Sequence, residues 1–389
     1  MKGLGSLILF FWLIHMPVLA QSPLGSYELE VFGWKNTTSG RLEVAGEPGD
    51  YFGRVTFQSK RERVFALGSD DVSPDTMVFY LGDRNGYLKL YRKANQAWQG
   101  AFKYFGLRGE LKAVKTGENA PEALQRLTKL KPLTTGVITT KGQESFPVFD
   151  TEAEGLYYTR EGHILLSLRA GEEWATPKAI RFSTSARDSA PYLSPDGTYM
   201  VFTSDRPFGS GNKKNLWRSD RVNGQWSEPT ALPAPVNIDS LGDYHAAIAG
   251  NGDLYFVSYN RPGGKGKSDI YHAELRSDGS WRVRNLGDSI NSDKSEADVF
   301  IAPDESYLLF ASTDRTDSYG ADDIYISQRE NDNWRQPRNL GPLVNSFAYE
   351  YGAWVDQLNG YLYFNSFRRG SSDIYRIALA ELEVFSDLE

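Results

Sequence analysis

The chain repeats one pattern about every 54 residues from residue 143 onward. Four phenylalanines end similar apolar segments at this spacing, a second aromatic follows each of them, and an asparagine completes three of the units. A degenerate first copy begins near Gln143, with "GLYY" at 155–158 and Trp174. A fixed period of this length indicates an array of one supersecondary unit. The anchors are Phe202, Phe256, Phe310 and Phe364, then Trp217, Tyr271, Tyr325 and Tyr375, then Asn237, Asn291 and Asn345.

Each unit contains four short apolar or alternating runs separated by turn residues. In the second unit the runs are "APYL", "TYMVF", "NLWRSD" and "QWSEPTAL", with "SPDG" and "VNG" between them. Asp-Gly and Asn-Gly between such runs are hairpin signals, and no helical period is present. Four strands in each repeat predict a β-propeller blade. We interpret the repeated aromatics as packing between blades, the fourth-strand Trp as a cover for the outer edge, and the repeated Asp and Asn as turn residues.

Five copies predict five blades, with six as the alternative if the N-terminal region supplies another. The fifth unit ends in "AELEVFSDLE" and lacks the Trp-containing fourth strand. The stretch "TTGVITT" at 134–140, just before the first unit, is therefore expected to be a strand that closes the propeller. A propeller needs such a closing contact because its first and last blades must meet.

The units resemble the TolB-type, WD-like propeller repeats of bacterial exported proteins. The resemblance is carried by "APYLSPDGTYMVFTSDRP" at 190–207, "YFVSYNRPGGKGKSDIY" at 255–271 and "YLLFASTDRTDSYGADDIY" at 307–325. It implies one blade per repeat, in proteins that mostly bind other proteins or cell-envelope polymers. TolB itself has six such blades behind an α/β domain. Because the N-terminal part here is rich in β-strand patterns, a role in the Tol system does not carry over.

The composition and the first residues predict an exported protein. Residues 1–20 have Lys2 before an apolar run at 7–14 and small residues at 18–20, which indicates a signal peptide. We therefore expect a periplasmic or secreted protein whose mature chain has no transmembrane segment. The absence of cysteine excludes thiolate metal sites and cysteine nucleophiles. A net charge of −7 argues against a nucleic-acid partner.

The region before the repeats predicts a separate all-β domain. Residues 21–118 contain about eight alternating runs with Gly-rich turns, which indicate a small antiparallel barrel or sandwich. "GSYELEVFGW…GYLKLYR…WQGAFKYFGLRGELKAVK" loosely resembles a lipocalin-like barrel, which would enclose an apolar cavity; a packed domain without ligand is the alternative. Residues 119–142 form the expected linker, with a short helix at 121–130 and Asn119 as its cap. The propeller then occupies 143–389.

Charged residues recur at two positions of every repeat. An acidic residue precedes each strand-end aromatic by 13 or 14 positions, and an arginine follows the second run. One interpretation is a charged funnel at a channel mouth that binds a ligand. The other is pairing of carboxylate with guanidinium between blades, which recurrence in every unit favours. The acidic residues are Glu144, Asp188, Asp243, Glu296 and Glu350; the basic ones are Arg206, Arg261, Arg315 and Arg368 or Arg369.

Departures from the repeat are more informative about chemistry. Two positions past each acidic residue stand Phe146, Ala190, His245, Asp298 and Gly352. His245 and Asp298 are thus expected side by side in adjacent blades, with Tyr244 and Tyr351 one position earlier in their own blades. A histidine, a carboxylate and two phenols could bind sugar hydroxyls or act in general acid–base catalysis. The simpler alternative is a histidine that is hydrogen-bonded to Asp298.

Two loops resemble ligand sites only in part. "DRTDSYGADD" at 314–323 gathers Asp314, Asp317, Asp322 and Asp323, which makes Ca²⁺ a possible ligand, although the spacing does not match the twelve-residue calcium loop. "RPGGKGK" at 261–267 has the composition of a phosphate cradle but no following helix, so we expect a plain loop. No cofactor is predicted.

The sequence therefore favours an exported, non-catalytic binding protein that engages a cell-envelope protein or polysaccharide through the channel face of a propeller. The alternative is a carbohydrate-active enzyme on the same scaffold, a polysaccharide lyase or glycoside hydrolase that uses His245. A third hypothesis is a lipophilic ligand inside the N-terminal barrel. Fold alone does not choose between them, since propellers host both binding proteins and enzymes.

Overall fold

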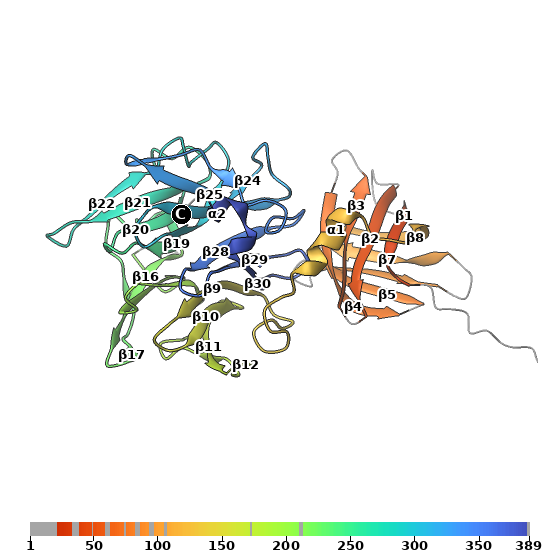
Figure 1. The fold of residues 1–389 in the computed structure, drawn as a ribbon, viewed down its shortest axis with the longest axis horizontal. Helices are drawn as coiled ribbons and strands as arrows, with labels where there is room; N and C mark the ends of the chain where they lie inside the picture. Colours follow the sequence, from red (N-terminus) through yellow and green to blue (C-terminus); the bar gives the residue numbers. More distant parts are fainter. Residues whose placement is uncertain are drawn as a thin grey trace, which may run out of the picture.

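The computed structural model describes residues 22–386 apart from 33–38, 49, 59–62, 74, 82–85, 93–96, 105–106, 172 and 210–212. Two all-β bodies lie side by side, with a short helical segment between them (Figure 1). The predicted signal peptide at 1–20 lies outside the described residues. In the part of the chain that is described, neither α-helix has the length and apolar character needed to cross a membrane.

The first body is a closed antiparallel barrel of eight strands. All eight predicted runs became strands, and β8 pairs with β1 to close the sheet. Closure decides between the two predicted architectures in favour of the barrel. The strands are β1 (Gly25–Phe32), β2 (Ser39–Glu47), β3 (Asp50–Gln58), β4 (Arg63–Ser73), β5 (Thr76–Leu81), β6 (Gly86–Tyr91), β7 (Trp98–Tyr104) and β8 (Leu107–Gly117).

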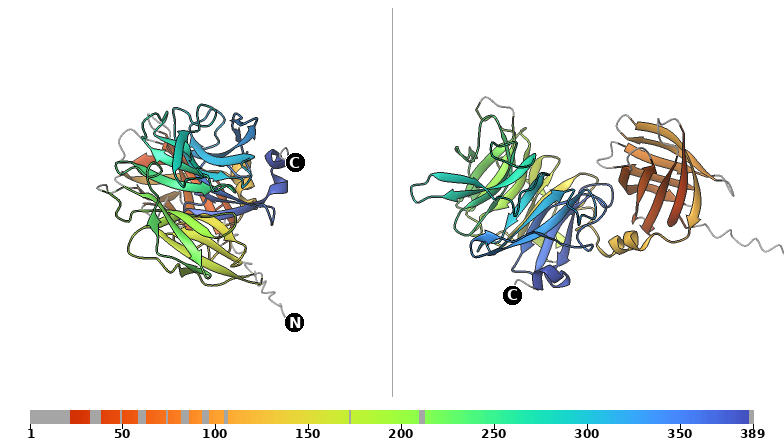
Figure 2. Two further views of the ribbon diagram at one scale, coloured as in Figure 1. Left: turned by 90° about the vertical axis from the view of Figure 1, so that its left-hand side faces the viewer. Right: turned by 90° about the horizontal axis from the view of Figure 1, so that it is seen from above.

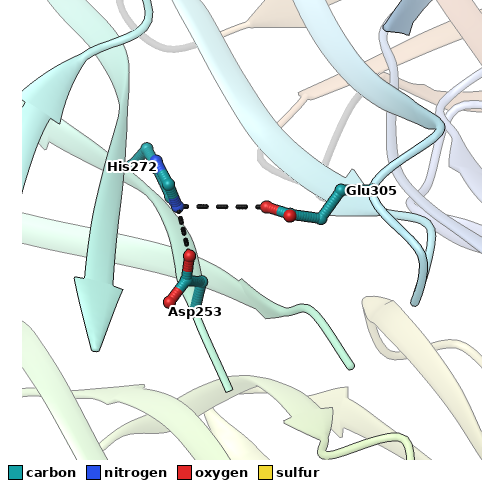
Figure 3. A group of neighbouring side chains, drawn as sticks. All are labelled: Asp253, His272 and Glu305. Carbon is teal, nitrogen blue, oxygen red and sulfur yellow. Dashed lines mark hydrogen bonds and ion pairs between the residues drawn. The ribbon is translucent and has the colours of Figure 1, made fainter. Parts of the chain in front are cut away.

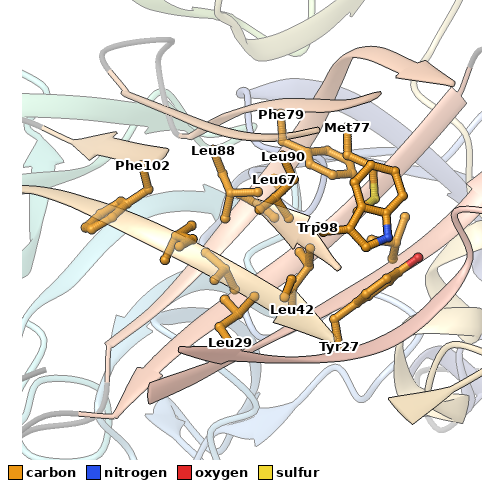
Figure 4. Close-up of a cluster of buried hydrophobic side chains, with 14 of the residues drawn as sticks. Tyr27, Leu29, Leu42, Leu67, Met77, Phe79, Leu88, Leu90, Trp98 and Phe102 are labelled. Carbon is orange, nitrogen blue, oxygen red and sulfur yellow. The ribbon is translucent and has the colours of Figure 1, made fainter. Parts of the chain in front are cut away.

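The barrel interior is a packed hydrophobic core (Figure 4). Alternate residues of each strand point inward, so Tyr27, Leu29 and Val31 of β1 are buried while the residues between them are not. Large side chains such as Phe57, Phe79 and Trp98 fill the centre (Figure 4 labels the last two). Eight strands leave an interior just wide enough for side chains to fill. The lipocalin-like cavity expected from the loose resemblance is therefore occupied by the protein's own core.

The linker differs from its prediction in two places. A helix begins as predicted, as α1 (Glu122–Arg126) followed by a 3₁₀ turn (Leu127–Lys129), but its cap is Pro121 without a side-chain hydrogen bond, and not Asn119. Residues 134–140 form turns instead of the predicted closing strand. Their backbone is tied by hydrogen bonds among 134–139, while Leu133 N donates to Ile374 O (2.7 Å) in the last blade. Val137 and Ile138 still cover that blade by apolar packing.

The second body is a propeller of five sheets, as the five repeats predicted. The six-blade alternative is wrong for the described chain, because the N-terminal region forms the separate barrel. The first three sheets comprise β9 (Glu144–Asp150), β10 (Gly155–Arg160), β11 (His163–Ala170), β12 (Glu173–Trp174) and β13 (Lys178–Ala179); β14 (Asp188–Leu193), β15 (Tyr199–Ser204), β16 (Asn215–Val222), β17 (Gln225–Trp226) and β18 (Thr230–Ala231); and β19 (Gly242–Ile248), β20 (Leu254–Tyr259), β21 (Ser268–Leu275) and β22 (Trp281–Asn285).

The last two sheets complete a ring. They comprise β23 (Glu296–Ile301), β24 (Tyr307–Thr313), β25 (Asp322–Glu330), β26 (Asn333–Trp334) and β27 (Arg338–Asn339), then β28 (Glu350–Asp356), β29 (Tyr361–Ser366) and β30 (Asp373–Ala378). The innermost strands contact one another in the cyclic order β9, β14, β19, β23, β28 and β9 again. A 3₁₀ turn (Leu379–Glu381) and α2 (Glu383–Ser386) end the described chain beside the fifth blade (Figure 2).

Every innermost strand carries a β-bulge at the same position. The register shifts between Ser189 and Tyr192 in β14, for example, and the other four inner strands shift at the equivalent point. The bulged residue has a left-handed backbone in all five blades, with φ between 48° and 59°. A bulge redirects a side chain away from the sheet. The five bulged residues are the five departures identified in the sequence: Phe146, Ala190, His245, Asp298 and Gly352.

The sequence suggested that the repeated asparagines are turn residues, and the structure shows that they are not. Each is buried and forms a two-way bridge with the third strand of its blade. Asn291 Oδ1 accepts from Ile270 N (2.8 Å) and its Nδ2 donates to Ile270 O (2.9 Å); Asn237 and Asn345 do the same with Leu216 and Ile324. The side-chain amide replaces a neighbouring strand in the ladder. The repeated Asp does have a turn role, since Asp269 Oδ2 accepts from Lys265 N (2.7 Å).

Candidate functional site

The five repeated carboxylates are buried and face arginines of their own blades. All are at most 1% exposed. The Arg206 guanidinium binds both oxygens of Asp188, at 2.8 and 3.2 Å, and the pairs Glu144–Arg160, Glu296–Arg315, Asp243–Arg261 and Glu350–Arg368 repeat the contact at 2.8 to 3.7 Å. These pairs lie within blades and not between them. A serine or threonine hydroxyl also donates to each carboxylate, as Ser258 does to Asp243 (2.6 Å).

Each of these arginines also holds the segment that enters its blade. Arg315 Nη2 donates to Ile290 O (2.7 Å), Arg206 Nη2 to Phe182 O (2.8 Å), and Arg368 to Val344 O. The Arg315 guanidinium lies 5.2 Å from the ring centres of both Phe310 and Tyr325, the repeated aromatics of its blade. We call the set of carboxylate, arginine, two rings and entering carbonyl the blade latch. Because the blade latch is buried, the repeated charges do not form the charged funnel that was one of the two predictions.

The fifth blade separates two neighbouring arginines. Arg368 is fully buried and belongs to the blade latch, whereas Arg369 reaches the barrel. The Arg369 guanidinium pairs with Asp50 and lies 4.6 Å from the centre of the Phe52 ring. Burial raises the pKa of the Glu350 carboxyl, which the Arg368 charge opposes. The sequence could not say which arginine pairs with Glu350.

The bulged residues meet inside the channel and narrow it at their level, while a hollow of about 180 Å³ lies toward the opposite end of the inner strands. They line a cavity of about 30 Å³ together with the residues that follow them. The Phe146 ring lies 4.6 Å from the His245 ring and 5.6 Å from the Tyr351 ring, although these belong to three different blades. The space is that of about one water molecule. A sugar ring does not fit there.

Two of the four catalytic candidates form a pair, and within the described structure no hydrogen bond joins the other two to it. His245 Nδ1 contacts Asp298 Oδ1, as we predicted from their equivalent positions in adjacent blades. Tyr351 OH, however, lies 2.6 Å from Ser372 Oγ, so this hydroxyl is engaged by its own blade. The Tyr244 ring is 5.9 Å from the His245 ring and folds back over Gly242. The four side chains do not converge on an open pocket.

The surface around the channel carries aromatics and carboxylates, which we call the mouth patch: the exposed Tyr259, Asp314 and Tyr349 and the half-buried Tyr244 and Asp322. These residues lie where the inner strands begin, because Tyr259 pairs with Gly242 at the start of β19 and Tyr349 directly precedes β28. Tyr259 is 44% exposed and Tyr349 51%. Burial and the carboxylates of Asp322 and Asp314 raise the pKa of the Tyr349 hydroxyl, so these groups are neighbours.

Asp322 is the most perturbed carboxyl of the mouth patch. Its burial, with the nearby charges of Asp298 and Asp323, raises its pKa to about 7. Asp322 Oδ1 is enclosed and accepts no hydrogen bond within the described structure. The calcium cluster suggested for this loop is not assembled among the described residues: Asp317 accepts from Tyr325 OH (3.0 Å), Asp323 accepts from Tyr319 N (2.7 Å), and these carboxylates do not form a three-ligand group with Asp314 and Asp322.

One group of possible metal ligands escaped the sequence analysis: Asp253, His272 and Glu305, between the third and fourth blades (Figure 3). His272 Nε2 lies 2.8 Å from Asp253 Oδ2 and 3.9 Å from Glu305 Oε1. Its other nitrogen, Nδ1, accepts from Arg284 Nε (3.2 Å), which places the proton on Nε2. Arg329 and Tyr255 donate to Glu305. Because every member has a donor or acceptor and two guanidinium groups lie beside them, the group is a polar bridge between blades.

No protein-family model matches the chain, and no curated protein matches it. The chain is similar in structure to a TolB-like protein from Agrobacterium tumefaciens, at 14% identity and a TM-score of 0.42, over 62% of this chain and 78% of that one. It is also similar to a glycoside hydrolase (10%, TM-score 0.44, 64% and 90%) and to the calcium-binding protein regucalcin from A. tumefaciens (15%, TM-score 0.36, 64% and 72%). Likenesses this distant carry no argument about function.

Proposed function

We propose that this protein is exported and acts as a non-catalytic binding protein, which engages a cell-envelope protein or polysaccharide through the mouth patch. One observation carries the proposal. The channel is closed by Phe146 and His245 around a cavity of about 30 Å³, while the surface beside it exposes Tyr259 and Tyr349. A substrate pocket is normally a concave space of several hundred Å³. An exposed aromatic surface suits docking better than turnover.

The composition of the mouth patch favours a partner with cationic or hydroxyl groups. Tyrosine is enriched where proteins bind one another, because its ring offers apolar area and its hydroxyl a hydrogen bond. The exposed Asp314 adds negative charge near Tyr349. Ammonium, guanidinium and sugar hydroxyl groups all donate to carboxylates.

The experiment is a quantitative capture from a solubilised cell-envelope fraction. The double variant Tyr259→Ala/Tyr349→Ala should reduce the captured partner at least tenfold relative to the unaltered protein. The control is Leu358→Ala, since Leu358 is 79% exposed in the turn at the opposite end of the inner strands. Equal capture by the double variant and the control would contradict binding through the mouth patch.

The catalytic alternative rests on the pairing of His245 with Asp298. A carboxylate that orients an imidazole is a recurring arrangement in general-base catalysis. If the protein is a polysaccharide lyase or hydrolase, His245→Ala should abolish turnover while the melting temperature stays nearly unchanged. If His245→Ala lowers the melting temperature but abolishes no measurable turnover, the pair of His245 and Asp298 has only a structural role.

A further inference from the structure

A second surface, on the barrel, has the features of a ligand site. The outer face of β6, β7, β8 and β1 contains a hollow of about 510 Å³. It lies on the barrel and is separate from the mouth patch, which belongs to the propeller. Its lining includes two aromatic rings, a small side chain and charged groups: Phe32, Tyr87, Ala101, Lys103, Arg108 and Glu110.

The strand register arranges these residues in two adjacent rows. Tyr87 is paired with Lys103, and Lys103 with Arg108, across β6, β7 and β8. In the next row Ala101 is paired with Glu110, and Glu110 with Phe32 of β1. Ala101 offers only a methyl group between the two rows, and Tyr87 and Phe32 stand at opposite ends of the lining, on β6 and β1.

The hollow and its rim carry more positive than negative charge, in contrast to the whole chain with its net charge of −7. Lys103 and Arg108 line it, while Lys89 Nζ lies 4.8 Å from the Tyr87 ring centre and Lys112 Nζ 5.3 Å from that of Phe32. Within the described part of the barrel none of these four cations forms an ion pair. Glu110 is the one acidic residue among those that line the hollow. Among the described residues, these four cations outnumber the two carboxylates nearby, Glu110 and Glu30, of which Glu30 faces Lys112 across β1 and β8, and the excess of positive charge favours an anionic ligand.

We infer that this hollow binds an acidic polysaccharide, a chain of pyranose rings that carry carboxylates. The apolar faces of the sugar rings would stack on Tyr87 and Phe32. Lysine and arginine would pair with the sugar carboxylates, and Glu110 would accept from a hydroxyl group. A neutral glycan would form no ion pairs with the cations, and a polyanion without apolar ring faces would not stack on the aromatic side chains. The inference does not depend on the proposed function of the mouth patch.

The test titrates the full chain with polygalacturonate oligomers and follows binding by calorimetry at low and high salt. Phe32→Ala and Tyr87→Ala should each weaken binding at least fivefold, and Lys103→Gln/Arg108→Gln at least tenfold. The control is Tyr91→Ala: Tyr91 is an exposed aromatic of the same strand, β6, and does not line the hollow. Circular dichroism of each variant should match that of the unaltered protein.

Several results would overturn the inference. Dextran oligomers of equal length should not bind, and equal affinity for dextran would contradict recognition of charge. Equal affinity for double-stranded DNA or for phosphatidylglycerol vesicles would mean a general preference for anions. Unchanged binding in both aromatic variants would exclude stacking. Tyr259→Ala/Tyr349→Ala should leave this titration unaltered, so failure here and failure of the mouth patch can be told apart.

Discussion

At the scale of single residues, the repeat signature encodes one buried contact set, the blade latch. The spacing alone indicated that a carboxylate and an arginine recur together, and the structure pairs them in every blade. The partners beyond that pair were not predictable. Ile290 O and Val344 O enter the latch because of how the chain crosses between blades, which no local pattern records.

Arg368 and Arg369 give a matched test of the latch. Arg368→Met leaves Glu350 buried without a cation, so we expect a loss of about 3–5 kcal/mol in the free energy of unfolding. Arg369→Met removes a pair with the half-exposed Asp50, and we expect a loss of about 1 kcal/mol or less. Urea denaturation of both variants measures the difference. Equal losses would contradict the distinct roles of these neighbours.

Asp322 should make stability depend on pH. Its pKa is raised to about 7 in the folded protein, so the folded state keeps its proton at pH values where the unfolded chain has lost it. Stability from this group therefore falls as the pH rises from about 4 to about 7. Asp322→Asn should abolish that fall and be the more stable protein at pH 8, by no more than about 4 kcal/mol. Urea midpoints at pH 5 and pH 8 test this, and an unchanged pH profile in the variant would contradict it.

At the scale of elements, strand existence was predictable and strand geometry was not. The eight barrel runs and the blade strands follow from alternation and turn chemistry. The bulges of the inner strands do not, because the left-handed residues include Phe146 and Ala190, which have no local preference for that backbone. Residues 134–140 misled the prediction because their apolar positions pack on the fifth blade without joining its sheet.

Hydrogen bonds between blades hold the bulges of some strands. Thr203 Oγ1 accepts a hydrogen bond from His245 N (3.0 Å). In the same way, Thr159 Oγ1 accepts from Ala190 N and Asn365 Oδ1 accepts from Phe146 N. Thr203→Val should cost about 1–2 kcal/mol in the free energy of unfolding, since a buried N–H loses its acceptor. The equivalent position of the next blade is already a valine, Val257, so the shape is compatible with the fold. A neutral effect in thermal denaturation would show that the hydrogen bond contributes nothing.

At the scale of the whole molecule, the barrel and the propeller form a direct contact. Phe52 on the outside of the barrel packs with Leu124 and Leu127 of the linker and with Phe347 of the propeller. A Cβ atom on Gly370, whose φ is 83°, would come within 2.3 Å of Gly68 N in the barrel, so the two backbones touch. The sequence predicted both domains but not this contact. Neither the 54-residue repeat nor the alternation of apolar and polar residues indicates which residues of one domain touch the other.

Phe347→Asp should weaken the contact between the barrel and the propeller. A charge at this position would face the apolar cluster around Phe52, so we expect a larger radius of gyration in small-angle X-ray scattering and faster proteolysis within 119–142. Tyr349→Asp is the control, since Tyr349 lies two residues further along and belongs to the mouth patch. An identical scattering profile for Phe347→Asp and the unaltered protein would contradict the contact.

We propose that the whole molecule binds a partner through the mouth patch and performs no chemistry in its channel. Hydrogen–deuterium exchange of the full chain, with and without a solubilised cell-envelope fraction, tests it most directly. We expect protection in the loops that carry the mouth patch, at 259–267, 314–323 and 345–349. The turns at the opposite end of the inner strands, at 194–197, 303–306 and 357–360, should exchange as before. Protection confined to those opposite turns, with none in the mouth-patch loops, would contradict binding through the mouth patch.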